Sequence, residues 1–226
     1  MVAPDPEQLL GGETRRWLLK HTASQRGLTL IELAVALTIT AILLGAGVPS
    51  FVSWIRNTHI RTTAEAFQNG IQLARAEAVR RNRPVRFQIT DTLAADCIRS
   101  TTGTNWVVSL NDIDATAAKC DSTPTDPPAL PAVPDAENPY IIQARPNSDG
   151  SANTLVTADQ SGLIFNGLGR VTPAPTGDVT IGIVGNTGTC VADGGSVRCL
   201  RIIVSTNGQV RICDPAITLS GDPRAC

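Results

Sequence analysis

A 21-residue apolar stretch near the N-terminus limits what this chain can fold into more than any other feature. Residues 28–48 are apolar, small or hydroxylic, except for Glu32. As a helix that rises about 1.5 Å per residue, the stretch is about 31 Å long, enough to cross a hydrocarbon core about 30 Å thick. We therefore expect residues 28–48 to span a membrane once.

The residues before this stretch do not fit an ordinary secretory signal. Such a signal has a shorter apolar core and a small-residue cleavage site after it, whereas here Gly27 lies before the apolar run. Four basic residues precede the helix with no acid among them: Arg15, Arg16, Lys20 and Arg26. This charge predicts that the N-terminal end stays in the cytoplasm and that the globular part after the helix faces the periplasm or the outside.

The sequence around Gly27 resembles the class III leader of type IV pilins and pseudopilins. An Arg-Gly pair is followed by an apolar helix with an acid, Glu32, at its fifth residue. The resemblance implies that residues 1–27 are a prepilin leader, and that a prepilin peptidase cuts between Gly27 and Leu28 and methylates the new amine. Most family members have Phe where this chain has Leu28.

Glu32 is costly in a membrane unless it is neutralised. An acid at the centre of a spanning helix costs about 2.5–3.5 kcal/mol on insertion scales, and somewhat less near a helix end. The resemblance implies that Glu32 pairs with the N-terminal amine of a neighbouring subunit in a filament core. The alternative is a plain signal anchor in which Glu32 lies at headgroup depth.

The helix is predicted to continue beyond the membrane. Pilins commonly carry a proline where this chain has Pro49, and proline loosens or kinks a helix. After it, apolar and small residues recur at three- and four-residue spacing, which predicts an amphipathic helix over 49–83: Phe51, Ile55, Thr58, Thr62, Ala66, Phe67, Gly70, Ile71, Ala74 and Ala78. Because Pro84 disfavours a helical conformation at Arg83, we expect the helix to end near Asn82.

Three segments, 67–85, 162–170 and 201–211, resemble the helix end, first strand and distal strands of the GspH/FimT family. This family holds minor pseudopilins of type II secretion and minor type IV pilins. The resemblance implies a low-abundance structural subunit that initiates or caps a filament. Its implied partners are other major and minor pilins or pseudopilins and an inner-membrane assembly platform.

Residues 84–226 are predicted to form one β-rich periplasmic domain. Alternating residues predict a strand over 85–90 with one wet face, and further strands over 106–110, 163–166, 179–184, 197–205 and 209–213. Asn207-Gly208 predicts a hairpin turn between the last two, and five prolines predict an irregular surface loop over about 112–139. The expected fold is α+β and pilin-like, with one long N-terminal helix packed on antiparallel sheet.

All six cysteines lie in the part predicted to be exported, where an even number indicates disulfides, although six thiols allow 15 pairings. A two-residue turn within 193–196 would place Cys190 opposite Cys199 at a non-hydrogen-bonded position, where Cα atoms are about 4.5 Å apart. The pairs Cys213–Cys226 and Cys97–Cys120 are chosen mainly because their members are close in sequence. A metal site is the rival interpretation, but the chain has no Cys-x-x-Cys, and both histidines are far from any cysteine in the sequence.

The sequence offers no catalytic constellation and no cofactor motif, so we do not expect an enzyme. The net charge of −1 excludes a global basic field for nucleic acid. The alternative function is DNA binding during natural transformation, which the family resemblance associates with a C-terminal Gly-Arg-x-Arg motif. Arg211 and Arg224 lie in partial versions of that motif, each lacking the first arginine.

A second group of arginines surrounds the predicted helix end. They either contact phosphates or are solvated cations that the helix dipole favours: Arg75, Arg80, Arg81, Arg83 and Arg86.

Overall fold

The computed structural model describes Gly27 and residues 29–110, 119–124, 139–149, 153–219 and 221–226. They belong to two compact units, Met1–Gly45 and Ala46–Cys226. One helix, α1, spans Leu30–Arg81. Eight strands and a short 3-10 helix follow it: β1 Val85–Thr90, β2 Asn105–Ser109, β3 Ile141–Arg145, β4 Thr154–Ala158, β5 Gly162–Phe165, β6 Val179–Gly185, η1 Val191–Asp193, β7 Leu200–Val204 and β8 Val210–Cys213.

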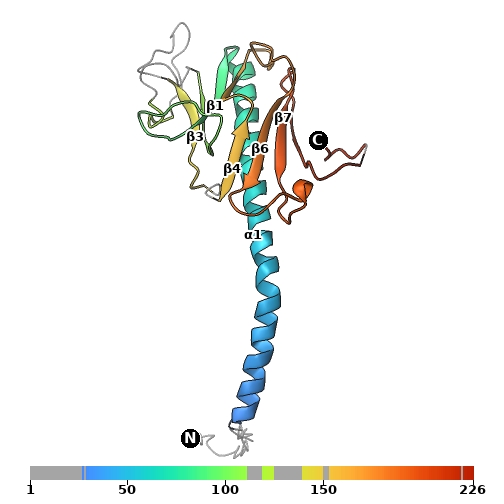
Figure 1. Cartoon of the computed structure of the whole chain (residues 1–226). Helices are drawn as coiled ribbons and strands as arrows, with labels where there is room; N and C mark the ends of the chain where they lie inside the picture. The colour runs from blue at the N-terminus through green and yellow to red at the C-terminus, as the bar shows by residue number, and fades with distance from the viewer. Residues whose placement is uncertain (1–26, 28, 111–118, 125–138, 150–152, 220) are drawn as a thin grey trace, which may run out of the picture. The chain divides into compact units, whose positions relative to one another are not determined.

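The strands form two four-stranded sheets in which every neighbouring pair is antiparallel. The first sheet has the order β3-β2-β1-β5 and the second has the order β4-β6-β7-β8. Within the unit that begins at Ala46, Figure 1 shows β6 and β7 beside the second half of α1. The predicted α+β fold, with one long helix on antiparallel sheet, is confirmed.

The C-terminal end of α1 is fixed by a left-handed residue. Asn82 has a φ of 49°, and asparagine tolerates this conformation better than most residues. The amide of Arg83 donates to the carbonyl of Ala78 at 3.2 Å, and that of Asn82 donates to Val79 at 3.3 Å, which is the bonding of a Schellman motif. Pro84 then prevents continuation, so the helix ends where the sequence predicted.

From Ile60 onward, one face of α1 is buried against both sheets. Its core residues are spaced by four and three positions: Ile60, Ala64, Phe67, Ile71, Ala74 and Ala78. Phe67 packs edge-on against Phe87 of β1, which in turn packs against Trp106 of β2. The prediction that this face begins at Phe51 is wrong, because Phe51 and Thr58 are exposed and full burial begins at Ile60.

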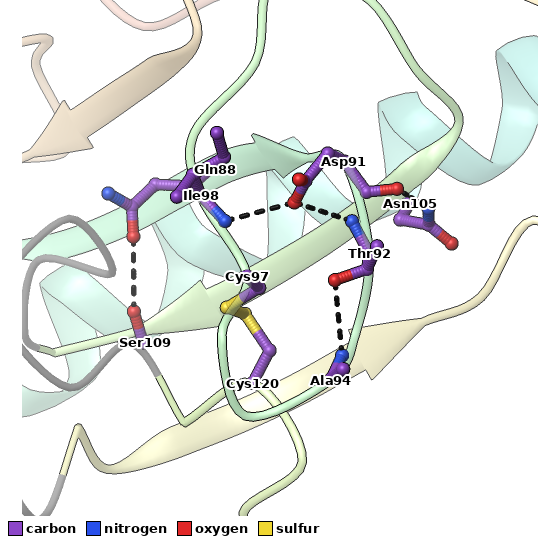
Figure 2. Close-up of a disulfide and its surroundings, with 9 residues drawn as sticks. All are labelled: Gln88, Asp91, Thr92, Ala94, Cys97, Ile98, Asn105, Ser109 and Cys120. Carbon is purple, nitrogen blue, oxygen red and sulfur yellow. Dashed lines mark hydrogen bonds between the residues drawn. A yellow bond between two sulfur atoms is a disulfide. The ribbon is translucent and has the colours of Figure 1, made fainter.

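The outer face of β1 is not wet, contrary to the prediction from alternation. Gln88 is 2 % exposed and Thr90 is 0 % exposed, because the chain after β1 folds back over this face. Figure 2 shows the disulfide between Cys97 and Cys120 in this covering segment. A second, smaller core forms there from Cys97, Val107, Cys120 and Ile141.

Hydrogen bonds to Asp91 hold the covering segment in place (Figure 2). The Asp91 carboxylate accepts hydrogen bonds from the backbone amides of Thr92 and Ile98 at 2.7 and 2.9 Å. The backbone carbonyl of Asp91 accepts a hydrogen bond from the Asn105 side chain at 2.7 Å. Below the segment, Ser109 donates to the Gln88 side chain at 3.5 Å. The segment that follows β1 therefore covers the polar face of this strand and is held there by hydrogen bonds and a disulfide.

The turn between β7 and β8 is one residue longer than a two-residue Asn-Gly turn. Val204 pairs with Val210, and the Ser205 amide donates to the Gln209 carbonyl at 3.0 Å, which leaves residues 206–208 as the loop. Gly208 has a φ of 81°, as expected of the left-handed residue that ends a three-residue loop. The predicted hairpin is confirmed, with this change of loop type.

The edge strands of the two sheets are β3, β5, β4 and β8. Residues outside the sheets form backbone hydrogen bonds or bridges at three of them, β4, β5 and β8. Thr101 and Gly103 bond to β4, Thr172 bonds to β5, and Asp214 directly after β8 bridges to Ala225. Strands β3 and β4 were not predicted. Most of the predicted proline-rich loop over 112–139 lies outside the described residues, which here include only 119–124 and 139.

Candidate assembly site and exposed surfaces

The first turn of α1 is capped by its own side chains. The Thr29 hydroxyl accepts from the Glu32 amide at 3.2 Å, and its oxygen lies 3.5 Å from a Glu32 carboxylate oxygen. Threonine before the first helical residue and glutamate three residues later resemble a capping box. The sequence analysis missed this local role of Glu32, although the spacing Thr-x-x-Glu could have revealed it.

The residues around Glu32 present an apolar surface. Every described side chain over 29–45 is exposed, including Leu30, Ile31 and Leu33. By length and composition, α1 is the one described helix that could cross a membrane. Gly27 is exposed, Leu28 lies outside the described residues, and so does the side chain of Pro49. Glu32 is therefore a carboxylate on an otherwise apolar helix surface.

The six cysteines form three disulfides: Cys97–Cys120, Cys190–Cys199 and Cys213–Cys226. These are the pairs expected from the sequence. The predicted two-residue hairpin turn within 193–196 is wrong, because residues 191–193 form the 3-10 helix η1. Cys190 still reaches Cys199, with Cα atoms 5.5 Å apart, because the chain turns back through Gly194 at a φ of 84°.

The second disulfide, Cys190–Cys199, closes a compact turn. Among the described residues, no three His, Cys, Asp or Glu side chains come close enough to hold a metal ion. All six cysteine sulfur atoms are in disulfides. The arrangement of cysteines therefore serves to cross-link loops in the described part of the chain.

The two C-terminal arginines that were candidates for DNA contact bond within the chain. Arg224 forms an ion pair with Asp222 at 2.8 Å, and Arg211 donates to the carbonyl of Ala225 at 2.9 Å. The hydrogen bond from the Arg224 side chain lowers the pKa of Asp222 to about 2. Nearby, Arg198 pairs with the buried carboxylate of Asp214 at 2.9 Å. Arg198 and Arg224 are therefore paired with carboxylates, whereas Arg211 bonds a backbone carbonyl.

A groove of about 540 Å³ lies between α1 and the C-terminal segment of the same unit. Apolar side chains line part of it, namely Trp54, Ile212 and Ile217, and the two pairs Arg61–Glu65 and Arg198–Asp214 line another part. Both ion pairs in this lining are formed within the chain.

The arginines at the helix end also bond within the chain. Arg75 donates to the carbonyl of Gly169 at 3.1 Å, and Arg86 donates to the carbonyl of Leu110. Arg80 and Arg81 both bond Glu77, and the hydrogen bond from Arg80 contributes most to lowering the pKa of that carboxyl. The bond from Arg75 fixes α1 to the loop after β5, the bond from Arg86 joins β1 to the end of β2, and the bonds to Glu77 lie within the helix. Neither sequence-based alternative included these contacts.

Comparison with known proteins identifies the family. Residues 63–208, more than half of the chain, match the family model described as Type II transport protein GspH. The chain belongs to the GspH family. Residues 22–48 of this GspH-family chain also match the prokaryotic N-terminal methylation motif, which includes Gly27, Leu28 and Glu32. The family resemblance drawn from the sequence is thereby confirmed, and the chain is a minor pilin or pseudopilin.

Solved structures similar to this GspH-family chain include the type IV minor pilin FimU of Pseudomonas aeruginosa strain PAO1, in two crystal forms. One is 17% identical, covers 69% of this chain and 88% of its own, and has a TM-score of 0.42. The other is 16% identical, covers 67% and 90% respectively, and has the same TM-score of 0.42. A comparison with curated proteins gives no match. None of these comparisons favours the DNA-binding alternative.

Proposed function

We propose that this minor subunit enters a type IV pilus or a type II secretion pseudopilus through α1 and helps to initiate or cap the filament. The observation that carries the proposal is Glu32, a lone carboxylate on an exposed apolar helix surface, inside a stretch that matches the methylation motif. A subunit of this design needs a partner that neutralises the acid once the helix leaves water.

The partner we propose for Glu32 is the N-terminal amine of a neighbouring subunit. Cleavage by a prepilin peptidase between Gly27 and Leu28 would create that amine. An acid inside an apolar environment is expensive when isolated and much less so when it is paired with a cation. The pair would therefore favour a subunit that sits in register with its neighbour on the inner-membrane assembly platform.

We infer the orientation in the membrane from charge and redox chemistry. The basic leader is expected to stay in the cytoplasm, so Pro49 and the residues after it would lie on the periplasmic side. Three disulfides in the unit that begins at Ala46 support an oxidising compartment for that unit. The inner membrane, with a periplasmic globular part, is thus the proposed location before assembly.

The variants Glu32→Gln and Thr29→Ala separate the two roles of the helix end. Glu32→Gln removes the charge needed for pairing, so we expect normal cleavage after Gly27 and loss of incorporation into sheared filaments. Thr29→Ala removes the cap at a cost of about 1 kcal/mol and keeps the charge, so incorporation should persist. The measurement is the amount of subunit in filament and membrane fractions by immunoblot. Normal incorporation of Glu32→Gln would contradict the pairing role.

A further inference from the structure

An aromatic pair on α1 faces outward although aromatic side chains normally favour burial. Phe51 and Trp54 are 60 and 62 % exposed, and their rings stack with centroids 5.8 Å apart. Trp106, by contrast, is 2 % exposed and lies in the core. The pair lies before Ile60, where full burial against the sheets begins. The folded unit itself therefore leaves both rings largely uncovered.

The position of the pair in the chain points to the membrane as the partner. No charged residue occurs between Glu32 and Arg56. The 23 uncharged residues 33–55 form about 34 Å of helix, slightly more than a hydrocarbon core of about 30 Å. The uncharged stretch thus reaches past residue 48, where the sequence analysis ended the spanning segment, and its last residues include Phe51 and Trp54.

The chemistry of the pair fits the boundary between lipid and water. Tryptophan is enriched at that boundary because its ring is apolar and its indole N–H can still donate to water or to headgroups. The first charges that follow are Arg56 and Arg61, cations that can approach lipid phosphates while Arg61 keeps its bond to Glu65 at 2.9 Å. Apolar, aromatic and cationic residues therefore follow one another in the order found across a bilayer surface.

We propose that the Phe51–Trp54 pair lies in the headgroup region of the bilayer leaflet farther from Gly27 and fixes the depth at which the chain leaves the membrane. This inference rests on the proposed function, since it requires a membrane-anchored subunit. The competing partner is a protein seated in the groove that Trp54 helps to line, which would keep Trp54 away from lipid.

The fluorescence of Trp54 tests the inference, because the chain has only three tryptophans. The substitution Trp17→Phe in the full chain leaves Trp54 and the buried Trp106. The protein is reconstituted into vesicles of phosphatidylethanolamine and phosphatidylglycerol that contain lipids brominated either near the headgroup or near the end of the acyl chain. We expect most Trp54 emission to be lost with the shallow bromines and less with the deep ones. In the control that also carries Trp54→Phe, the Trp106 emission should be unaffected by either lipid.

Two contrary outcomes have different meanings. If the chain resists alkaline extraction from the vesicles but Trp54 is not quenched by either lipid, or is quenched more by the deep bromines, the depth inference is overturned and the membrane-anchored function stands. If alkaline extraction removes the chain from the vesicles, the proposed function itself fails.

Discussion

Gly208 and Gly221 have similar backbone conformations in contrasting surroundings. Their φ angles are 81° and 90°, in the left-handed region that favours glycine. A Cβ at Gly208 would lie 2.1 Å from the carbonyl oxygen of Gly169 and 3.3 Å from the Arg75 side chain. A Cβ at Gly221 would meet nothing within 4 Å. The two positions therefore separate the cost of backbone strain from the cost of a lost close approach.

The matched variants Gly208→Ala and Gly221→Ala should differ in stability. Gly221→Ala should cost about 1–2 kcal/mol, the strain of a left-handed alanine. Gly208→Ala should cost a further 1–3 kcal/mol or so, because the β7–β8 turn must move away from Gly169 and Arg75. Urea unfolding of the detergent-solubilised protein, followed by circular dichroism, measures both. Equal losses would show that the contact with Gly169 adds nothing.

At the scale of elements, the burial of the outer face of β1 depends on the segment that covers it, and the residues of the strand itself do not predict that burial. Val85, Phe87 and Ile89 alternate with polar residues, so a half-wet strand was the natural prediction. Burial of Gln88 and Thr90 comes instead from the segment directly after β1, which folds back over them and is cross-linked to Cys120, 23 residues after Cys97. Local alternation cannot report such a long-range contact.

Removing the cross-link from this cover should loosen β1 and β2 locally. Each of the double variants Cys97→Ala/Cys120→Ala and Cys213→Ala/Cys226→Ala should lose about 3 kcal/mol, because their loops of 23 and 13 residues have similar closure entropies. Only the Cys97–Cys120 disulfide lies in the segment that covers the outer face of β1. Only the variant that lacks this disulfide should therefore show faster hydrogen exchange at Gln88 and Val107. Unchanged exchange there would mean that the bonds to Asp91 suffice to hold the cover.

The elements that the sequence predicted well are those with local signals. The end of α1 follows from Asn82 and Pro84, and the β7–β8 hairpin follows from Asn207-Gly208. The missed strand β4 gains its partners from distant segments, β6 and residues 101–103. The hairpin turn predicted within 193–196 is wrong because Gly194 and Gly195 are compatible both with a tight hairpin turn and with the end of a 3-10 helix. The cap by Thr29 has a local signal, Thr-x-x-Glu, but the same Glu32 also carries the membrane signal, so its spacing from Thr29 was not used in the prediction.

At the scale of the whole molecule, the GspH-family fold and the methylation motif indicate a filament subunit without naming the filament. A deletion strain scored for surface pili, secreted enzymes and DNA uptake distinguishes the possibilities. We expect loss either of pili or of secretion, restored by the wild-type chain and not by the Glu32→Gln variant. Loss of DNA uptake with normal pili would instead favour the DNA-binding alternative, and a strain normal in all three would contradict a role in either filament.

The extra backbone pairing at the sheet edges has a consequence for unassembled subunits. Exposed edge strands are templates on which other chains can add and aggregate. The backbone bonds from flanking segments to β4 and β5, and the bridge from Asp214 to Ala225 directly after β8, occupy part of these edges and leave fewer backbone groups free for strand addition. We therefore expect the folded unit that begins at Ala46 to resist edge-to-edge aggregation before assembly, so that the proposed joining of subunits through α1 does not compete with strand addition.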